Sequence, residues 1–203
     1  MEIKNIIFDF GGVFIDVDYK RTEKAFIDAG ISNFSELYSQ QSASPLFEDL
    51  EKGKLSNDDF YIALRKASGV ELNNGHITGC WNGILGNYYP EAIEKAKQLK
   101  QHYRIFLFSN TNAIHYTRFM EIYHQQFGRD DFNELFEKAW YSHEVGIRKP
   151  YPEAYEWVLQ DAGLKAAETL FIDDTLSNIE GAKKAGLQTI YLQPPMKVWE
   201  LGL

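Results

Sequence analysis

The sequence predicts an α/β fold with a Rossmann-like parallel sheet, helices on both faces, and a helical cap inserted after the first strand. Two observations predict this fold class. Short apolar runs alternate with helical patterns along most of the chain, which is typical of βαβ units and a parallel sheet. The alternation stops between residues 16 and 88, where helical patterns continue and no convincing strand is found.

Five short runs have the composition of buried strands, because each is almost continuously apolar and is bounded by polar residues or glycine. They are IKNIIFDF (3–10), RIFLFSN (104–110), KAWYS (138–142), TLFIDD (169–174) and LQTIYL (187–192). Helices are expected between them. Proline suits a first helical turn and glycine a helix end, which favours helices over 90–103, 151–163 and 175–186.

The stretch from residue 16 to residue 88 is too long for a single crossover between two strands. Its helical patterns predict four short helices, over 19–30, 32–40, 56–69 and 74–85. The economical interpretation is a helical cap over the carboxyl end of the sheet. We therefore expect a core formed by 1–15 and 89–203, and a cap formed by 16–88.

Composition excludes several classes of function. The net charge of −8 argues against nucleic acid or an anionic membrane as the main partner. The single cysteine, Cys80, excludes an internal disulfide framework and a thiolate metal cluster. No stretch approaches the length of a membrane span, and the start of the chain lacks a signal-peptide pattern. We expect a cytoplasmic protein, a monomer or homodimer, that acts on a small molecule.

Polar side chains stand where three of the predicted strands end. Asp9 ends the first strand, Ser109 and Asn110 end the run RIFLFSN, and Asp173 and Asp174 end the run TLFIDD. In an open α/β sheet, ligands bind in the crevice beyond the carboxyl ends of the strands. The sequence therefore predicts that these groups converge in one crevice.

The converging groups suit a phosphate beside a metal ion. Three carboxylates in a small space repel one another, and Mg²⁺ with its preference for oxygen ligands removes that repulsion. Lys149, at the start of a loop into a helix, adds positive charge, while Ser109 can donate to phosphate oxygens. Gly12 lets the backbone approach a bound anion closely. Asp9 is then positioned as a nucleophile.

Four motifs in order resemble the haloacid dehalogenase superfamily, in its branch with a helical cap after the first strand. They are DFGGV, LFSNT, the lysine of RKP, and FIDDTLSNIEGAKKAG, and together they extend over essentially the whole chain. The opening GGVFIDVD is similar to that of bacterial sugar-1-phosphate phosphatases of this branch. The resemblance implies a phosphatase that acts on a small phosphorylated metabolite, with a sugar phosphate expected.

The resemblance also implies a role for each residue. Asp9 would attack phosphorus and form an aspartyl-phosphate, which water then hydrolyses, while Ser109 and Lys149 hold the phosphoryl group. The implied substrate-binding residues are Gly12, Ser109, Asn110 and Lys149. The implied ligands of Mg²⁺ are Asp9, the backbone carbonyl of Gly11, Asp174, and Asp173 either directly or through water.

Gly11 departs from the family pattern, in which a second aspartate at this position acts as general acid and base. General acid–base catalysis contributes about 10²- to 10⁴-fold to a rate. A phosphatase could use another acid, with Asp16 and Asp18 as candidates, or a substrate with a good leaving group. The alternatives are a metal-independent 2-haloacid dehalogenase-type hydrolase and a pseudo-enzyme that binds a phosphorylated ligand. Paired acids at Asp173 and Asp174 favour the phosphatase.

Cap residues could also contact the substrate. The segment FEDLEKGKLS looks like the cap turn that faces the active site in relatives, which makes Glu48 and Lys52 candidates. Asn178 lies four residues beyond Asp174 on the same predicted helical face, where it could orient that carboxylate.

Overall fold

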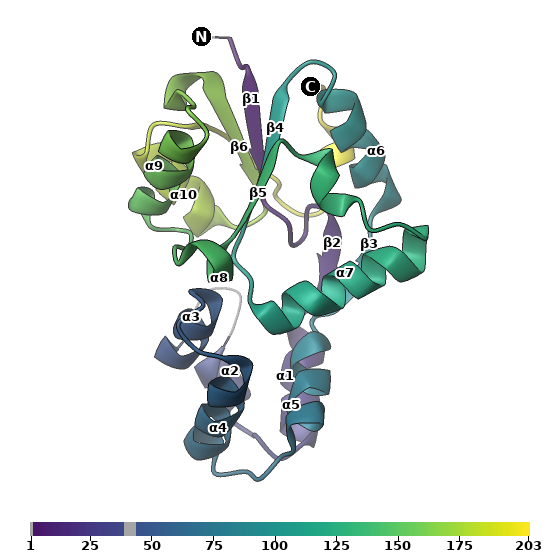
Figure 1. Ribbon diagram of the computed structural model, residues 1–203, viewed down its shortest axis with the longest axis vertical. Helices are drawn as coiled ribbons and strands as arrows, with labels where there is room; N and C mark the ends of the chain where they lie inside the picture. Colours follow the sequence, from purple (N-terminus) through teal and green to yellow (C-terminus); the bar gives the residue numbers. More distant parts are fainter. Residues whose placement is uncertain (1, 39–43) are drawn as a thin grey trace.

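A single parallel sheet forms the centre of the protein, as the sequence predicts. The computed structural model describes residues 2–38 and 44–203, and in it the five predicted strands pair in the order β5-β4-β1-β6-β7 (Figure 1). The pairing of β1 with both β4 and β6 is parallel and puts Ile7 beside Phe106 and Phe171. The strands are β1 (Asn5–Phe8), β4 (Arg104–Ser109), β5 (Lys138–Tyr141), β6 (Thr169–Asp173) and β7 (Gln188–Tyr191).

Helices cover both faces of this sheet, because successive side chains of a strand point to opposite faces. Ile6 and Phe8 pack toward α6 and α7, whereas Ile7 packs toward α9 and α10. Both layers are visible in Figure 1. The helices of these layers are α6 (Pro90–Leu99), α7 (Ala113–Phe127), α9 (Pro152–Asp161) and α10 (Leu176–Lys184). Shorter helical turns are η1 (Phe132–Leu135), α8 (Ser142–Val145), η2 (Ala166–Glu168) and η3 (Val198–Glu200).

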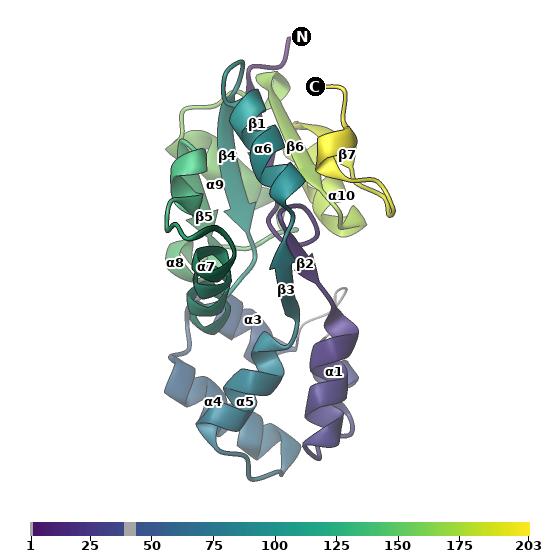
Figure 2. The same ribbon diagram turned by 90° about the vertical axis from the view of Figure 1, so that its right-hand side faces the viewer.

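A group of helices, which we call the helical insert (Tyr19–Asn82), lies beyond the carboxyl ends of the strands (Figures 1 and 2). An aromatic cluster that includes Phe34, Phe47 and Trp81 holds it together. The prediction of four helices is wrong, because the described residues contain a further short one, α3. The helices are α1 (Tyr19–Asp28), α2 (Phe34–Leu37), α3 (Pro45–Glu51), α4 (Asn57–Ser68) and α5 (Asn74–Asn82).

A small antiparallel ribbon connects the helical insert to the rest of the chain. β2 (Ile15–Val17) pairs with β3 (Leu85–Tyr88), so the two connections run side by side (Figure 2). The expectation that 16–88 contains no strand is therefore wrong. Strands of three and four residues are too short to show the alternation by which a strand is recognised in a sequence. Among the described residues, no helix is both long and apolar enough to cross a membrane.

Helix α10 lies directly against the loop that carries Lys149. A Cβ atom at Gly181, inside α10, would overlap the backbone carbonyl oxygen of Pro150. The glycine therefore sets how closely the helix approaches this loop. Gly79, inside α5, has open space where its Cβ would be.

These two helical glycines make a matched pair for measuring that contact. We expect Gly181→Ala to lower the free energy of unfolding by about 1–3 kcal/mol, because the loop at Pro150 must move. Gly79→Ala should raise it by about 0.5–1 kcal/mol, since alanine is the better helix former. Urea unfolding of both variants measures the difference. A stabilising Gly181→Ala would contradict the close approach of α10.

Candidate active site

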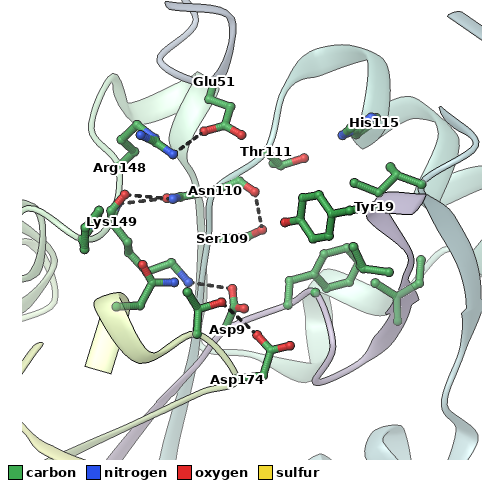
Figure 3. Close-up of a pocket in the computed structure, with 18 of the residues that line it drawn as sticks. Asp9, Tyr19, Glu51, Ser109, Asn110, Thr111, His115, Arg148, Lys149 and Asp174 are labelled. Carbon is green, nitrogen blue, oxygen red and sulfur yellow. Dashed lines mark hydrogen bonds and ion pairs between the residues drawn. The ribbon is translucent and has the colours of Figure 1, made fainter. Parts of the chain in front are cut away.

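A cavity of about 420 Å³ lies at the carboxyl edge of the sheet, and its lining includes all of the predicted site residues except Gly12 and Asp173. Asp9 follows β1, Ser109 ends β4, and Asp174 follows β6; all three line the cavity (Figure 3). Ser109 does not serve as the N-cap of α7, because the side chain of Asn112 accepts the capping hydrogen bond from the backbone of His115.

Lys149 lies buried between two of the carboxylates. Its Nζ donates to Asp9 Oδ1 at 2.6 Å and to Asp173 Oδ2 at 2.9 Å, and the side chain is 1% exposed. The amide of Asn110 holds the backbone of Lys149 in place: it donates to the lysine carbonyl and accepts from the lysine N–H, both at 2.9 Å. Asn110 thus positions Lys149, and a contact between Asn110 and substrate stays a prediction.

Asp173 is completely buried, and the protein satisfies both of its oxygens. Oδ1 accepts from the backbone N–H of Thr175 at 2.7 Å, and Oδ2 accepts from both Lys149 and Asn178 at 2.9 Å. The expectation that Asn178 orients Asp174 is therefore wrong. The side chain of Asn178 reaches the carboxylate that lies one residue earlier and faces into the protein.

Asp174 faces the cavity and approaches the glycine pair that follows β1. A Cβ atom at Gly12 would overlap Asp174 Oδ2, and Gly12 also has a φ of +69°, which disfavours other residues. A glycine is therefore needed here for a reason that the sequence did not show. One carboxylate oxygen from each of Asp9, Asp173 and Asp174 lies within 4.8 Å of the others.

This cluster has the composition of a site for a hard divalent cation. Burial and the charge of Asp9 raise the pKa values of Asp173 and Asp174, because three carboxylates face one ammonium group. Burial alone would lower the pKa of Lys149, but the charges of Asp173 and Asp9 outweigh burial and raise it. The remaining negative charge and the all-oxygen donor set fit Mg²⁺.

The helical insert supplies the opposite side of the cavity, but the sequence analysis missed the arginine that joins this insert to the core. Arg148 binds two carboxylates of α3, with its guanidinium 2.9 Å from Glu48 Oε1 and 2.9 Å from Glu51 Oε2. The hydroxyl of Tyr38 donates to Glu51 Oε1 at 3.1 Å, and Tyr19 lies alongside (Figure 3). The available signals were the i, i+3 spacing of the two glutamates and the arginine that precedes Lys149.

The candidates for contact with substrate from this side differ in position. Glu48 lines the cavity, whereas Lys52 pairs with Glu48 at 3.0 Å and lies over the ring of Tyr151. The two aspartates that were candidates for the general acid, Asp16 and Asp18, have structural partners instead. Asp16 pairs with Arg21 at 2.7 Å and Asp18 caps α1, and neither aspartate lines the cavity.

The raised pKa values of the buried aspartates predict how stability depends on pH. An acid whose pKa is raised in the folded state stabilises that state at low pH, and this contribution disappears as the pH rises through the folded pKa. We expect the two buried aspartates to contribute a loss of more than about 1 kcal/mol of unfolding free energy to the metal-free protein between pH 5 and pH 8. Added Mg²⁺ should restore stability mainly at pH 8.

Thermal and urea unfolding with chelator or with Mg²⁺ measure both effects. Asp174→Asn, which replaces a titrating group by a neutral one of the same shape, should show a weaker dependence on pH. An Asp174→Asn variant whose stability depends on pH as strongly as that of the wild-type protein would contradict the charge balance described above.

Comparison with known proteins agrees with this geometry. The D-ribitol-5-phosphate phosphatase of Bacteroides thetaiotaomicron is 32% identical over 187 residues, which cover 92% of this chain and 90% of the relative. The sesquiterpene phosphatase astK of Aspergillus oryzae is 28% identical over 93% of this chain and 89% of its own.

A solved structure has the same fold along nearly its whole length. It is an aspartate-to-alanine variant of a HAD family enzyme from Bacteroides thetaiotaomicron, in complex with magnesium and inorganic phosphate. The TM-score is 0.86, with 30% identity and 95% coverage of both chains. A family model for haloacid dehalogenase-like hydrolases matches residues 3–186. The chain therefore belongs to the haloacid dehalogenase-like hydrolase family.

Proposed function

We propose that this protein hydrolyses the phosphomonoester of a small, hydroxyl-rich metabolite, a sugar or polyol phosphate, through an aspartyl-phosphate on Asp9. The observation that carries the proposal is the buried cluster in which Lys149 bridges Asp9 and Asp173 beside Asp174. A nucleophilic carboxylate, a fixed cation and an oxygen-rich metal site are what phosphoryl transfer needs. Relatives that are named as phosphatases support the same activity.

Each residue has a role in this proposal. Asp9 attacks phosphorus with one carboxylate oxygen, while Lys149 and Ser109 hold the phosphoryl oxygens. Gly12 allows the backbone to approach the phosphate, and Asn110 keeps Lys149 in place. When bound, Mg²⁺ neutralises charge on the phosphoryl group and the carboxylates. The groups that would hold it are Asp9, Asp174, the carbonyl of Gly11 and, through water, Asp173.

The assignment of Asp174 as the direct ligand rests on which carboxylate is free to turn toward the cavity. Asp174 lines the cavity, whereas Asp173 uses both oxygens to bind Thr175, Lys149 and Asn178. Replacing these hydrogen bonds would leave the ammonium group of Lys149 with one carboxylate partner fewer. Asp173 is therefore better suited to orienting Lys149 and a metal-bound water.

The helical insert would act as a cap over this site. In this proposal the cap comprises residues 16–88, the core comprises 1–15 and 89–203, and the β2–β3 ribbon is the connection about which the cap moves. The ion pairs of Arg148 with Glu48 and Glu51 join the two parts across the cavity. Closure would keep water out until the leaving group has departed. We place this activity in the cytoplasm, in a monomer or homodimer.

Phosphate release from sugar phosphates, polyol phosphates and an activated aryl phosphate tests the proposed reaction. We expect turnover that needs Mg²⁺, stops with chelator, and falls by on the order of 10⁴-fold or more in Asp9→Asn, because the nucleophile is lost. Asp18→Asn is the matched control and should keep its activity, since asparagine caps a helix as well as aspartate does.

Two outcomes would contradict the phosphatase. Binding of Mg²⁺ and phosphate without turnover on any substrate, the aryl phosphate included, would favour a pseudo-enzyme. Release of halide from 2-haloacids in the presence of chelator would favour the dehalogenase-type hydrolase, whose reaction needs no metal ion.

A further inference from the structure

Gly11 leaves the proposed reaction without the acid that the family pattern places there. An alcohol leaves phosphorus readily only if its oxygen receives a proton as the bond breaks. This inference rests on the proposed function and asks which group supplies that proton. Asp16 and Asp18 are excluded by their positions, since one pairs with Arg21 and the other caps α1.

His115 lines the cavity but cannot supply the proton. Its Nε2 lies 3.2 Å from the carbonyl oxygen of Trp81, so this nitrogen carries the hydrogen and donates it to that carbonyl. The other nitrogen, Nδ1, accepts from the amide of Asn112 at 3.1 Å. Burial lowers the pKa of His115 to about 4, which keeps the ring neutral.

The glutamates on the insert side of the cavity are held by cations. Glu48 lies 3.0 Å from Lys52 and 2.9 Å from Arg148, and Glu51 lies 2.9 Å from the same guanidinium. The hydroxyl of Tyr151, a further lining residue, donates its hydrogen to Glu48 at 3.2 Å. These ion pairs join the insert to the core and hold both glutamates against cations.

Tyr19 has the position that an acid requires. It is the first residue of α1 and is separated from the ribbon strand β2 only by the N-cap Asp18, and its ring lies 5.9 Å from that of Tyr38 in a stacked arrangement. Its hydroxyl points into the cavity on the side of Ser109, with Asp9 and Asp174 below (Figure 3). The hydroxyl therefore faces the space between the nucleophile and the insert, where a leaving group must lie.

We propose that the phenol of Tyr19 donates the proton to the leaving-group oxygen, in place of the acid that is missing at Gly11. As Asp9 forms its bond to phosphorus, the bond from phosphorus to the substrate oxygen breaks, and the hydroxyl proton moves to that oxygen. The products are the alcohol, an aspartyl-phosphate and a tyrosinate. The water that then attacks the aspartyl-phosphate returns a proton to Tyr19, so the balance closes.

The surroundings of Tyr19 suit this role. Burial and the charge of Glu51 raise the pKa of Tyr19 above its ordinary value, so the phenol keeps its proton at neutral pH. The acid is weak, so it can serve only a leaving group that is itself a strong base, such as the alkoxide of a sugar or polyol. An acid of this kind helps poor leaving groups and adds little for good ones.

The test is a series of phosphate esters whose leaving groups differ in acidity, from p-nitrophenyl phosphate to the phosphates of polyols and simple alcohols. The parameter is kcat/KM, which reports only on steps up to departure of that group. In Tyr19→Phe we expect a loss of about 10²-fold on the poorest leaving group and almost none on p-nitrophenyl phosphate, so the dependence on leaving-group acidity becomes steeper. Tyr61→Phe is the matched control, because its hydroxyl contacts Thr78 away from the cavity.

The series separates proton donation from binding or packing. An equal loss on every substrate would assign Tyr19 to binding or structure and overturn the proposal, as would no loss on any. Failure of the proposed function would look different. In that case the wild-type protein would lack turnover that depends on both Mg²⁺ and Asp9, and the role of Tyr19 would be refuted with it.

Discussion

The buried ammonium group of Lys149 is the interaction on which the rest of the site depends. A buried lysine without partners is unfavourable, and so is a cluster of three carboxylates. Here the positive charge of Lys149 and the negative charges of the carboxylates stabilise each other. Asn110 fixes the lysine backbone, and α10 presses against the next residue because Gly181 has no side chain. The strand ends, the loop and α10 therefore fix the positions of one ammonium group and three carboxylates. This cluster keeps a net negative charge, which a divalent cation would neutralise.

Ion pairs between the core and the insert determine the other side of the cavity. Arg148 precedes Lys149 in sequence but points to the insert, where Glu48 and Glu51 bind its guanidinium. One short loop thus supplies the cation of the reaction centre and the cation that joins the two parts of the molecule. Tyr19 and Tyr38 both line this side of the cavity, where the hydroxyl of Tyr38 donates to Glu51 and that of Tyr19 faces the cavity (Figure 3). A cavity with this composition suits a neutral, hydroxyl-bearing leaving group.

The core could be predicted from the sequence because its strands lie in almost continuously apolar runs that are bounded by polar residues or glycine. Family membership followed from four motifs, and the structure brings Asp9, Ser109, Lys149 and Asp174 around one cavity. The structure of the insert was harder to predict from the sequence. Helix α3 and the ribbon are too short for a periodic signal, and a contact such as Arg148 with Glu51 joins residues that are almost a hundred positions apart. Tyr19 belongs to none of the four motifs. Its position at the cavity depends on the path of the ribbon, which the sequence analysis did not predict.

Acid quenching during turnover shows directly whether the phosphoryl group is transferred to Asp9. The protein would be mixed with Mg²⁺ and a sugar phosphate labelled in its phosphoryl group, stopped with acid, and digested for peptide mapping. We expect one acid-stable, hydroxylamine-sensitive label on the peptide that contains Asp9, and none in Asp9→Asn. Turnover without any label on that peptide, or a label on another residue, would contradict the assignment of Asp9 as the nucleophile.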